Sequence, residues 1–463
     1  MACHGNFLFV LLSLHLILAP LARSSMHTVD LDSLMPADNT CSSPEDLKES
    51  GPDNLSLQLA HRHGPCSPLD QEEIPSHEQI LSQDQSRVDS IHHHVATSRS
   101  SNRRKAYNPL NSLEIPARYG APIGTGNYIV SVGLGTPAKY FSVVFDTGSD
   151  VTWIQCKPCV TACYSQQDPI FDPTQSSTYS NISCSSNYCA QLDAQGCSGN
   201  SCLYGVQYGD GSYTVGFYAQ ETLTLTSSDV IPNFRFGCGE NNDGLFGKAA
   251  GLLGLGRDQT SLVSQTLGKY GGVFSYCLPA TSTSTGYLNF GSSSLPTNVK
   301  YTPLLTNSDT PTFYYINLIG ISVGGKQLPI SPTVFTSSGT IIDSGTVITR
   351  LPPDAYSALR TAFRQAMTRY KTAPALSILD TCYDFTGQSS VSYPQISFIF
   401  PETTVTLDGA GVFYVNGMSQ VCLAFAGNSD PSDMGIIGNV QQRKLNVVYD
   451  ASRKVVGFGP GTC

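Results

Sequence analysis

One short signature occurs twice in this chain. Residues 146–149 read Asp-Thr-Gly-Ser after an apolar stretch, and residues 343–346 read Asp-Ser-Gly-Thr after another. The surrounding residues repeat as well, with 127–135 matching 314–325 and 252–254 matching 436–438. This duplication predicts two related lobes, each built from a hairpin, an Asp loop and an apolar-apolar-Gly strand.

Two aspartates placed in this way can act as one acid–base unit. A glycine after each carboxylate lets the backbone turn tightly, and the next hydroxyl group can hold the outer carboxylate oxygen. If the lobes face each other, Asp146 and Asp343 meet and share one proton, because two carboxylates that close cannot both ionise cheaply. The ionised member can deprotonate a water molecule while the protonated member hydrogen-bonds a peptide carbonyl. Such a pair would hydrolyse peptide bonds best in acid.

Histidine is absent from the larger part of the chain. All nine histidines precede residue 95: His4, His15, His27, His61, His63, His77, His92, His93 and His94. Sites with a serine or cysteine nucleophile need an imidazole base, and most catalytic zinc sites need an imidazole ligand. Unless an N-terminal histidine reaches in, chemistry in the rest of the chain must rely on carboxylates. We therefore expect neither a metal nor a cofactor.

The first residues indicate export. Residues 7–21 are almost continuously apolar, but a run of about 15 residues is shorter than the roughly 20 that cross a membrane. We predict a cleaved secretory signal over residues 1–24. An uncleaved anchor stays an alternative, because the basic residues that usually precede the apolar core are missing. No long apolar stretch ends the chain, so no lipid or membrane anchor is expected there.

The cysteine count agrees with export. Of the 15 cysteines, 12 follow residue 118, and an even number in an exported protein predicts six disulfides there. Cys156 and Cys159 form a Cys-x-x-Cys motif that could instead be redox-active or half of a zinc site. Asn54 and Asn181 stand in Asn-x-Ser sequons and are predicted glycosylation sites.

Residues 25–118 form a distinct segment that we expect to be removed on maturation. Alternating apolar residues predict a strand at 55–59. Four apolar residues on a helical period predict an amphipathic helix over 78–95, namely Ile80, Leu81, Val88 and Ile91. Beyond residue 118, short strands between glycine and proline turns dominate, and one long helix is predicted for 353–370.

Two features of the N-terminal segment have several interpretations. The basic cluster of Arg99 and residues 103–105 is a solvated linker, a processing site, or a strip that pairs with acidic groups of the uncleaved precursor. The histidines gain charge below about pH 6.5. Such charging could loosen the segment from the rest of the chain; alternatively, these are ordinary solvated side chains.

These motifs resemble those of pepsin-type aspartic proteases, and more narrowly the nepenthesin-like branch found in plants. The resemblance implies a mainly β, bilobal pepsin-like acid protease fold, with the active-site cleft between two related lobes, 119–305 and 306–463. It implies that Asp146 and Asp343 are the catalytic pair. The residues expected to support them are Thr147, Gly148, Ser149, Ser344, Gly345 and Thr346.

The same resemblance places a substrate-binding flap at 204–218. Tyr208, Gly209, Asp210 and Gly211 match the flap tip, and Trp153 matches the indole that hydrogen-bonds the flap tyrosine. Residues 156–202 resemble the cysteine-rich insert of the nepenthesin-like branch. By analogy, the expected disulfides are Cys156–Cys159, Cys163–Cys238, Cys184–Cys202, Cys189–Cys197, Cys277–Cys463 and Cys382–Cys422.

The sequence therefore predicts a secreted, monomeric aspartic endopeptidase that acts on polypeptides in acid. It would be made as a zymogen with its prosegment as intramolecular inhibitor, and would reside in the apoplast or the vacuole. The alternative is a non-catalytic binding or inhibitor protein on the same fold. A plastid protein associated with nucleic acid is disfavoured, because the net charge is −9 and nucleic-acid binders carry basic surfaces.

Overall fold

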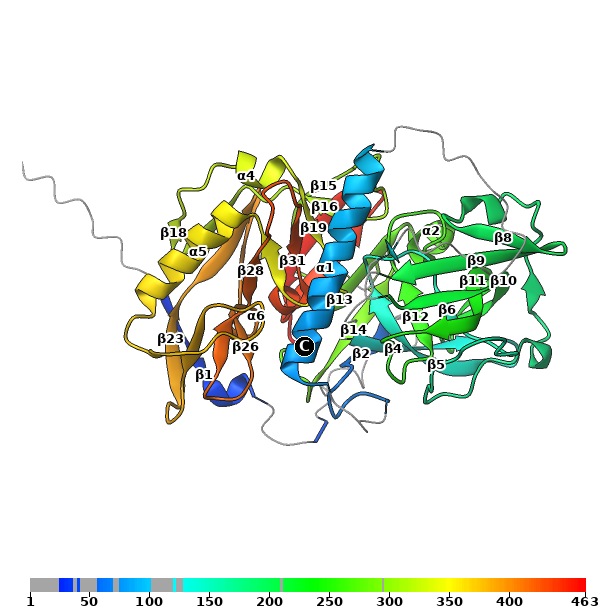
Figure 1. The fold of residues 1–463 in the computed structure, drawn as a ribbon, viewed down its shortest axis with the longest axis horizontal. Helices are drawn as coiled ribbons and strands as arrows, with labels where there is room; N and C mark the ends of the chain where they lie inside the picture. The colour runs from blue at the N-terminus through cyan, green and yellow to red at the C-terminus, as the bar shows by residue number, and fades with distance from the viewer. Residues whose placement is uncertain are drawn as a thin grey trace, which may run out of the picture.

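The computed structural model describes residues 25–35, 40–41, 56–69, 75–100, 120–121, 128–208, 211–293 and 295–463. Strands dominate, and they form two lobes that lie side by side, with helix α1 (His77–Ser100) running between them (Figure 1). The expected mainly β, bilobal architecture is confirmed.

The N-terminal lobe is built from long antiparallel strands. β10 (Tyr213–Thr226) pairs with β9 (Ser201–Tyr208) and β11 (Asp229–Asp243), and β4 (Tyr128–Leu134) pairs with β5 (Lys139–Asp146). The hairpin of β9 and β10 is the region expected to form the flap. The remaining elements are β3 (Gly120–Ala121), β6 (Trp153–Gln155), η3 (Pro173–Gln175), β7 (Ser180–Asn181), η4 (Cys189–Gln191), β8 (Gln195–Ser198), β12 (Gly251–Gly254), α2 (Leu262–Gln265) and α3 (Leu267–Tyr270).

The C-terminal lobe uses shorter strands and one long helix. Helix α5 (Pro353–Ala366) begins with a proline, whose missing N–H costs nothing at a first helical position. It ends before residue 370, short of the predicted end. The remaining elements are β16 (Tyr315–Ile316), β17 (Gly320–Val323), β18 (Lys326–Gln327), α4 (Thr333–Thr336), β19 (Thr340–Ile342), β20 (Thr349–Leu351), β21 (Lys371–Ala373), β22 (Cys382–Asp384), β23 (Ser390–Pro394), β24 (Ile396–Phe400), β25 (Thr403–Thr406), α6 (Gly409–Val412), β26 (Phe413–Val415), β27 (Val421–Leu423), β28 (Phe425–Gly427), β29 (Gly435–Ile437) and η5 (Asn439–Gln442).

One sheet contains strands from both halves of the chain. β13 (Val273–Cys277) pairs with β14 (Thr285–Phe290) and β30 (Leu445–Asp450), and β31 (Val455–Pro460) pairs with β30 and β15 (Lys300–Leu305). The N-terminal segment joins this sheet through β2 (Ser56–His61), which pairs with β14 and β4. β1 (Met26–Asp30) pairs with β23, and η1 (Leu31–Ser33) follows it. The segment is thus hydrogen-bonded to both lobes.

Helix α1 buries its apolar face against the C-terminal lobe. Ile80 and Leu81 pack in one cluster with Val347 and Ile348. Further along the helix, Val88, Ile91 and Val95 pack in a second cluster, whose other members are Phe313, Tyr315, Ile341, Met434 and Ile436. The predicted amphipathic helix is confirmed, and it is longer than the predicted range 78–95.

The disulfides correct four expected pairings. Cys277–Cys463 and Cys382–Cys422 are confirmed. The expected pairs Cys156–Cys159, Cys163–Cys238, Cys184–Cys202 and Cys189–Cys197 are wrong. The bonds formed instead are Cys156–Cys238, Cys159–Cys163, Cys184–Cys197 and Cys189–Cys202. Within the N-terminal segment, Cys41 pairs with Cys66.

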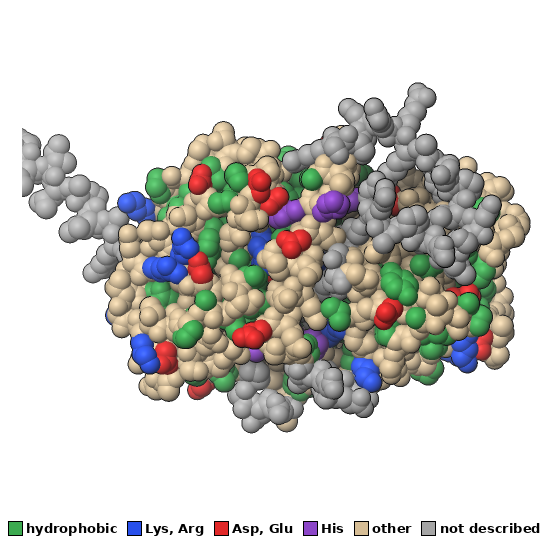
Figure 2. Space-filling view, viewed as in Figure 1, with side chains coloured by type: hydrophobic (Ala, Val, Ile, Leu, Met, Phe, Trp, Pro, Cys, Tyr) green, Lys and Arg blue, Asp and Glu red, His purple; other side chains and the backbone are tan. Residues whose placement is uncertain are grey.

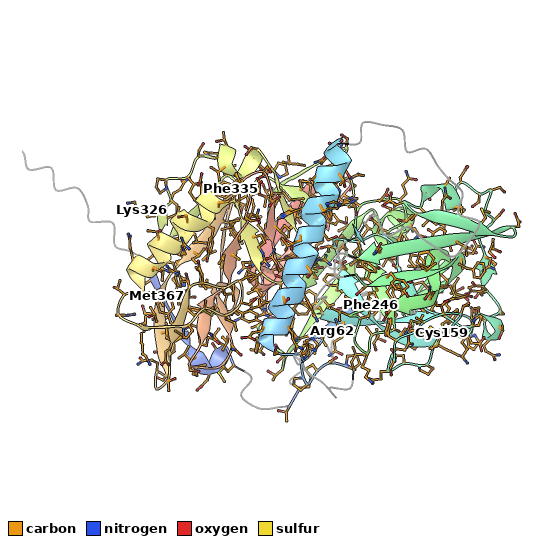
Figure 3. All side chains as sticks on the ribbon, viewed as in Figure 1. Arg62, Cys159, Phe246, Lys326, Phe335 and Met367 are labelled. Atoms are coloured by element: carbon orange, nitrogen blue, oxygen red, sulfur yellow. A yellow bond between two sulfur atoms is a disulfide. The ribbon has the colours of Figure 1, made fainter. Side chains whose placement is uncertain are left out.

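Strand register explains the first two corrections. β6 runs parallel to β11 with Ile154 opposite Cys238, so Cys156, just after β6, lies beside that cysteine. Cys159 then pairs with Cys163, on the side of the N-terminal lobe away from α1 (Figure 3). Because Cys156 and Cys159 each bond another cysteine, the redox and zinc interpretations of the Cys-x-x-Cys motif are also wrong.

Burial explains the other two corrections. Cys197 and Cys202 lie opposite each other on β8 and β9, so this register does not decide which of them pairs with Cys184 and which with Cys189. Cys189 and Cys202 are fully buried, whereas Cys184 and Cys197 are half-buried. Each cysteine therefore pairs with the cysteine that is buried to a similar extent.

Candidate active site

The two expected catalytic aspartates occupy matching places in the two lobes. Asp146 ends β5 and lies opposite Gly254 of the parallel strand β12. Asp343 follows β19, which is parallel to β29, and its N–H donates to the carbonyl of Ile437 at 3.0 Å. The duplicated sequence is thus a duplicated structure.

The glycine that ends each apolar-apolar-Gly strand is required by close backbone approach. A Cβ at Gly254 would lie 2.2 Å from the carbonyl oxygen of Asp150. A Cβ at Gly438 would lie 2.6 Å from that of Val347. Real Cβ atoms do not approach so closely, so a side chain at either position would displace the adjoining Asp loop.

The two Asp loops hold each other across the boundary between the lobes. The N–H of Thr147 donates to Ser344 Oγ at 3.1 Å, and the N–H of Ser344 donates to Thr147 Oγ1 at 2.9 Å. Both residues are buried. The two motifs differ at this position, but threonine and serine both supply the hydroxyl acceptor that the reciprocal bond needs.

Each carboxylate is also held within its own loop. Asp146 accepts from the N–H of Gly148 at 3.0 Å and from the hydroxyl of Ser149 at 2.8 Å. Asp343 repeats this pattern, accepting from the N–H of Gly345 at 3.1 Å and from the hydroxyl of Thr346 at 2.6 Å. The structure thus brings together all eight residues of the two motifs.

Arg87 of helix α1 places its guanidinium between the two carboxylates. Its Nη2 lies 2.8 Å from Asp146 Oδ1 and 2.8 Å from Asp343 Oδ2, and its Nε lies 3.0 Å from Asp343 Oδ2. All three side chains are only 1% exposed. Cβ atoms at Gly148 or Gly345 would come within 2.5 and 2.2 Å of Nη2, so both glycines leave room for this arginine.

Burial and charge oppose each other in this triad. Burial raises the pKa of Asp146, the Arg87 guanidinium lowers it, and the Asp343 carboxylate raises it again, so that the pKa of Asp146 lies above its usual range. For Arg87, burial lowers the pKa, but the two carboxylates outweigh burial and raise it. The Arg87 guanidinium therefore fills the space between the two carboxylates and offsets part of their negative charge.

Arg87 is not among the site residues expected from the sequence, although the sequence contains a signal for it. Leu81, Asp84, Arg87 and Ile91 recur at spacings of three and four residues, so both charged residues stand on the apolar face of the helix. Asp and Arg are almost never fully buried unless they are paired. Two opposite charges on a buried stripe therefore indicate partners elsewhere in the chain.

Asp84 is the second buried charge that α1 brings to the C-terminal lobe. Its carboxylate accepts from the backbone N–H groups of Val347 and Ile348 at 2.6 and 3.2 Å. It also pairs with Arg350 Nη2 at 3.0 Å. Burial raises the pKa of Asp84 despite the lowering by Arg350 and the two N–H donors.

The expected contact beneath the flap is present. Trp153 Nε1 donates to the hydroxyl of Tyr208 at 2.7 Å, and both side chains are buried. Phe246, labelled in Figure 3, packs edge-on against both rings. Gly211 has a φ of +87°, which suits a glycine in a turn. The expected flap residues Gly209 and Asp210 lie outside the described residues.

We expect Trp153→Phe to lower the free energy of unfolding by about 1–3 kcal/mol beyond the loss of packing, because the buried Tyr208 hydroxyl loses its donor. Tyr208→Phe leaves the buried indole N–H without its acceptor in the same way, but it keeps the ring, so its total cost should be smaller because little packing is lost. Urea unfolding followed by circular dichroism measures both. Strict additivity of the two costs in the double variant would show that the bond contributes nothing.

The remaining expected sites stay predictions. Asn181 is exposed on β7, where a glycan would find space, and Asn54 lies outside the described residues. Among the residues that the structure describes, no group of three His, Cys, Asp or Glu is placed to hold a metal ion. None of the described helices is long and apolar enough to cross a membrane.

Comparisons with known proteins agree with this geometry. Family models for the xylanase inhibitor N-terminal and C-terminal domains match residues 128–292 and 313–460. An aspartyl protease family protein of Arabidopsis thaliana is 49% identical over 95% of this chain and 94% of its own length. Aspartic proteinase nepenthesin-2 of Nepenthes gracilis is 41% identical over 73% of this chain and 78% of its own.

A solved structure supports the fold. Basic 7S globulin from soybean superimposes with a TM-score of 0.58 at 21% identity, over 72% of this chain and 91% of its own. Both matched family models together span most of the two lobes. With its two Asp loops paired across a bilobal β fold, this chain belongs to the pepsin-type aspartic protease family, in its nepenthesin-like branch.

Proposed function

We propose that this chain is the zymogen of a secreted aspartic endopeptidase that hydrolyses polypeptides in acid. The carrying observation is the pair of buried carboxylates, Asp146 and Asp343, one from each lobe, with mirrored hydrogen bonds. The apolar N-terminal stretch and the disulfides support export, because disulfides persist in oxidising compartments. The apoplast and the vacuole both satisfy this condition.

The proposed chemistry starts when Arg87 has left. The two carboxylates then share one proton, and the ionised member takes a proton from a water molecule between them. The resulting hydroxide attacks the carbonyl carbon of a peptide bond, while the protonated member hydrogen-bonds the carbonyl oxygen. The tetrahedral intermediate collapses when the C–N bond breaks and the leaving nitrogen accepts the proton that the carboxylate took from the water molecule. No covalent intermediate with the protein forms.

The N-terminal segment acts as the inhibitor in this proposal. Helix α1 holds Arg87 on both carboxylates and Asp84 on Arg350, so it blocks the cleft with three buried ion pairs. The cut that releases residues 25–118 would fall in the stretch from about residue 104 to 119, which includes part of the basic cluster and lies outside the described residues.

A non-catalytic binding or inhibitor protein is the second candidate, since the matching family models are described as xylanase inhibitor domains. The intact motifs favour the enzyme. The test is cleavage of a denatured protein by the matured chain between pH 3 and 7, with and without pepstatin, an inhibitor of this protease class. We expect cleavage in acid that pepstatin blocks. A folded chain, free of its prosegment, that cleaves nothing at any pH would favour the binding protein.

Several histidines of the prosegment are placed so that their protonation in acid would weaken its attachment. His61, His63 and His77 line a cavity of about 330 Å³ together with Arg443, and Tyr414 hydrogen-bonds His77. Burial, then the charges of neighbouring arginines, lower the pKa of His61 well below its ordinary value and that of His63 to about 3. Burial also lowers the pKa of His77.

The lowered pKa values of these histidines favour release of the prosegment in acid. Neutral histidines stabilise the docked prosegment above about pH 6.5, and this stability is lost as the pH falls toward the docked pKa, by up to about 1.4 kcal/mol per pH unit for each group. Asp84 acts in the opposite direction, because its raised pKa makes protonation favour the docked form. Figure 2 shows further histidines on the surface of α1, where His93 is exposed.

We therefore expect His61→Gln/His63→Gln to need more acid for maturation, with a midpoint lower by about one pH unit. With two of the three cavity histidines replaced, the stability of the docked prosegment depends less steeply on pH. Gel analysis of the precursor after incubation across pH 3 to 7 measures the midpoint, and His93→Gln is the control. A midpoint that does not move in the double variant would remove these histidines from the switch.

A further inference from the structure

Arg350 is a buried cation whose ionic partner belongs to the prosegment. It stands on β20 in the C-terminal lobe, and its side chain is 1% exposed. Nη1 donates to the carbonyl of Ile348 at 2.8 Å, and Nη2 donates to Asp84 at 3.0 Å and to Gln85 Oε1 at 3.3 Å. Two of these three acceptors lie on helix α1. Among the described residues, Asp84 is the carboxylate paired with Arg350.

The C-terminal lobe supplies a complete binding site for one carboxylate. The N–H groups of Val347 and Ile348 point at the oxygens of Asp84, and the guanidinium of Arg350 completes the set. Asp84 itself is fully buried. These donors belong to the C-terminal lobe and stay there when the prosegment leaves. The lobe therefore keeps a preformed site for a carboxylate group.

This site lies next to the catalytic pair. Asp84 and Arg87 are three residues apart on one helix, which corresponds to a rise of about 4.5 Å along the axis. Val347 directly follows Thr346, whose hydroxyl bonds Asp343. An extended chain advances about 3.3 Å per residue. A substrate held between the lobes along the path of α1 (Figure 1) would therefore reach the site one or two residues from its scissile bond.

When the prosegment leaves, Arg350 loses Asp84, the carboxylate paired with it. A hydrogen bond to a charged group contributes about 1.5–3 kcal/mol. An acidic substrate side chain can restore both the ion pair and the two N–H bonds. A neutral amide of the same size restores only part of them.

We propose that Arg350, with the N–H groups of Val347 and Ile348, forms a specificity site for an aspartate or glutamate one or two residues from the scissile bond, which Asp84 imitates in the zymogen. This inference rests on the proposed protease function. The preferred substrates are polypeptides with an acidic side chain beside the cleavage point.

The test compares fluorogenic peptides that differ only by Glu against Gln, placed one or two residues on either side of the scissile bond. The enzyme is the matured chain at about pH 5, where free Asp and Glu side chains are ionised. At one position we expect kcat/KM to be higher for the Glu peptide by a factor of about 10 to 100. A ratio near one at all four positions, with the Gln peptides hydrolysed, would overturn the inference and leave the protease function intact.

The same peptides then test Arg350 itself. We expect Arg350→Gln to bring the Glu-to-Gln ratio close to one, because the Glu peptide loses far more kcat/KM than the Gln peptide. The exposed Arg369→Gln is the matched control and should keep the ratio. If Arg350→Gln does not fold, Arg350→Lys replaces it, with a reduced but measurable preference expected. A ratio that stays unchanged in a folded Arg350 variant would refute the assignment, and failure to hydrolyse any peptide would instead refute the protease function.

Discussion

We expect Arg87→Gln to accelerate maturation of the precursor by about 100-fold or more at a fixed, mildly acidic pH. Removing one partner of a buried ion pair typically costs about 3–5 kcal/mol, and Arg87 is paired with two carboxylates at once. The two aspartates can share a proton after the change, so we expect the lower end of this range. A change of about 1.4 kcal/mol is a factor of ten in an equilibrium constant. A loss of about 3 kcal/mol would therefore raise the fraction of molecules with an open cleft by about 100-fold.

The rate of loss of the full-length band on a gel measures this effect. Arg87→Lys keeps one positive charge but lacks the planar fork, so an intermediate rate is expected. Glu78→Gln, on an exposed position of the same helix, is the matched control and should mature like the wild type. If Arg87→Gln matures at the wild-type rate, the guanidinium does not hold the cleft shut.

Asp146→Asn should lower kcat/KM for peptide hydrolysis by at least about 10⁴-fold, at the upper end of what a general acid or base contributes. An amide cannot take a proton from water, and it cannot share one with Asp343. The fold should survive, because the asparagine oxygen can accept from the N–H of Gly148, while its NH2 group can donate to the hydroxyl oxygen of Ser149. Asp343→Asn should have a similar effect, and the double variant should be no worse than either, since the pair acts as a unit.

A variant without activity cannot process itself, so maturation has to be supplied from outside. Replacing residues 103–105 with the recognition sequence of an unrelated protease lets one reagent mature every variant. Asp309→Asn, on an exposed position of the C-terminal lobe, is the matched control and should retain wild-type kcat/KM. Activity of Asp146→Asn within tenfold of the wild type would show that the chemistry does not use this carboxylate.

Much of the fold and of the candidate site could be predicted because the relevant signals are local or duplicated. The Asp loops and the glycines beneath them follow from short duplicated motifs, whereas the tryptophan–tyrosine contact was expected from the family resemblance. The amphipathic helix of the prosegment was also predicted, because its apolar period needs no knowledge of what lies opposite.

The parts that could not be predicted depend on contacts between distant residues. The partners of Arg87 lie 59 and 256 residues away, and no local pattern specifies them. The basic cluster of Arg99 and 103–105, a candidate for this pairing from sequence, lies outside the part of the chain whose side chains are described. The expected disulfides of the insert came from the family resemblance, because sequence alone does not choose among neighbouring cysteines. In the structure, burial separates Cys189 and Cys202 from Cys184 and Cys197.

The most direct test of the shared-proton pair is the pH dependence of kcat/KM for one neutral peptide, measured on the matured chain from pH 2 to 8. Two coupled carboxylates predict a bell-shaped profile with an acidic maximum, whose two limbs report apparent pKa values of the pair and not of either residue. The account predicts such a bell, with hydrolysis falling away toward neutral pH. A rate that is constant over this range, or that is highest at neutral pH, would contradict it.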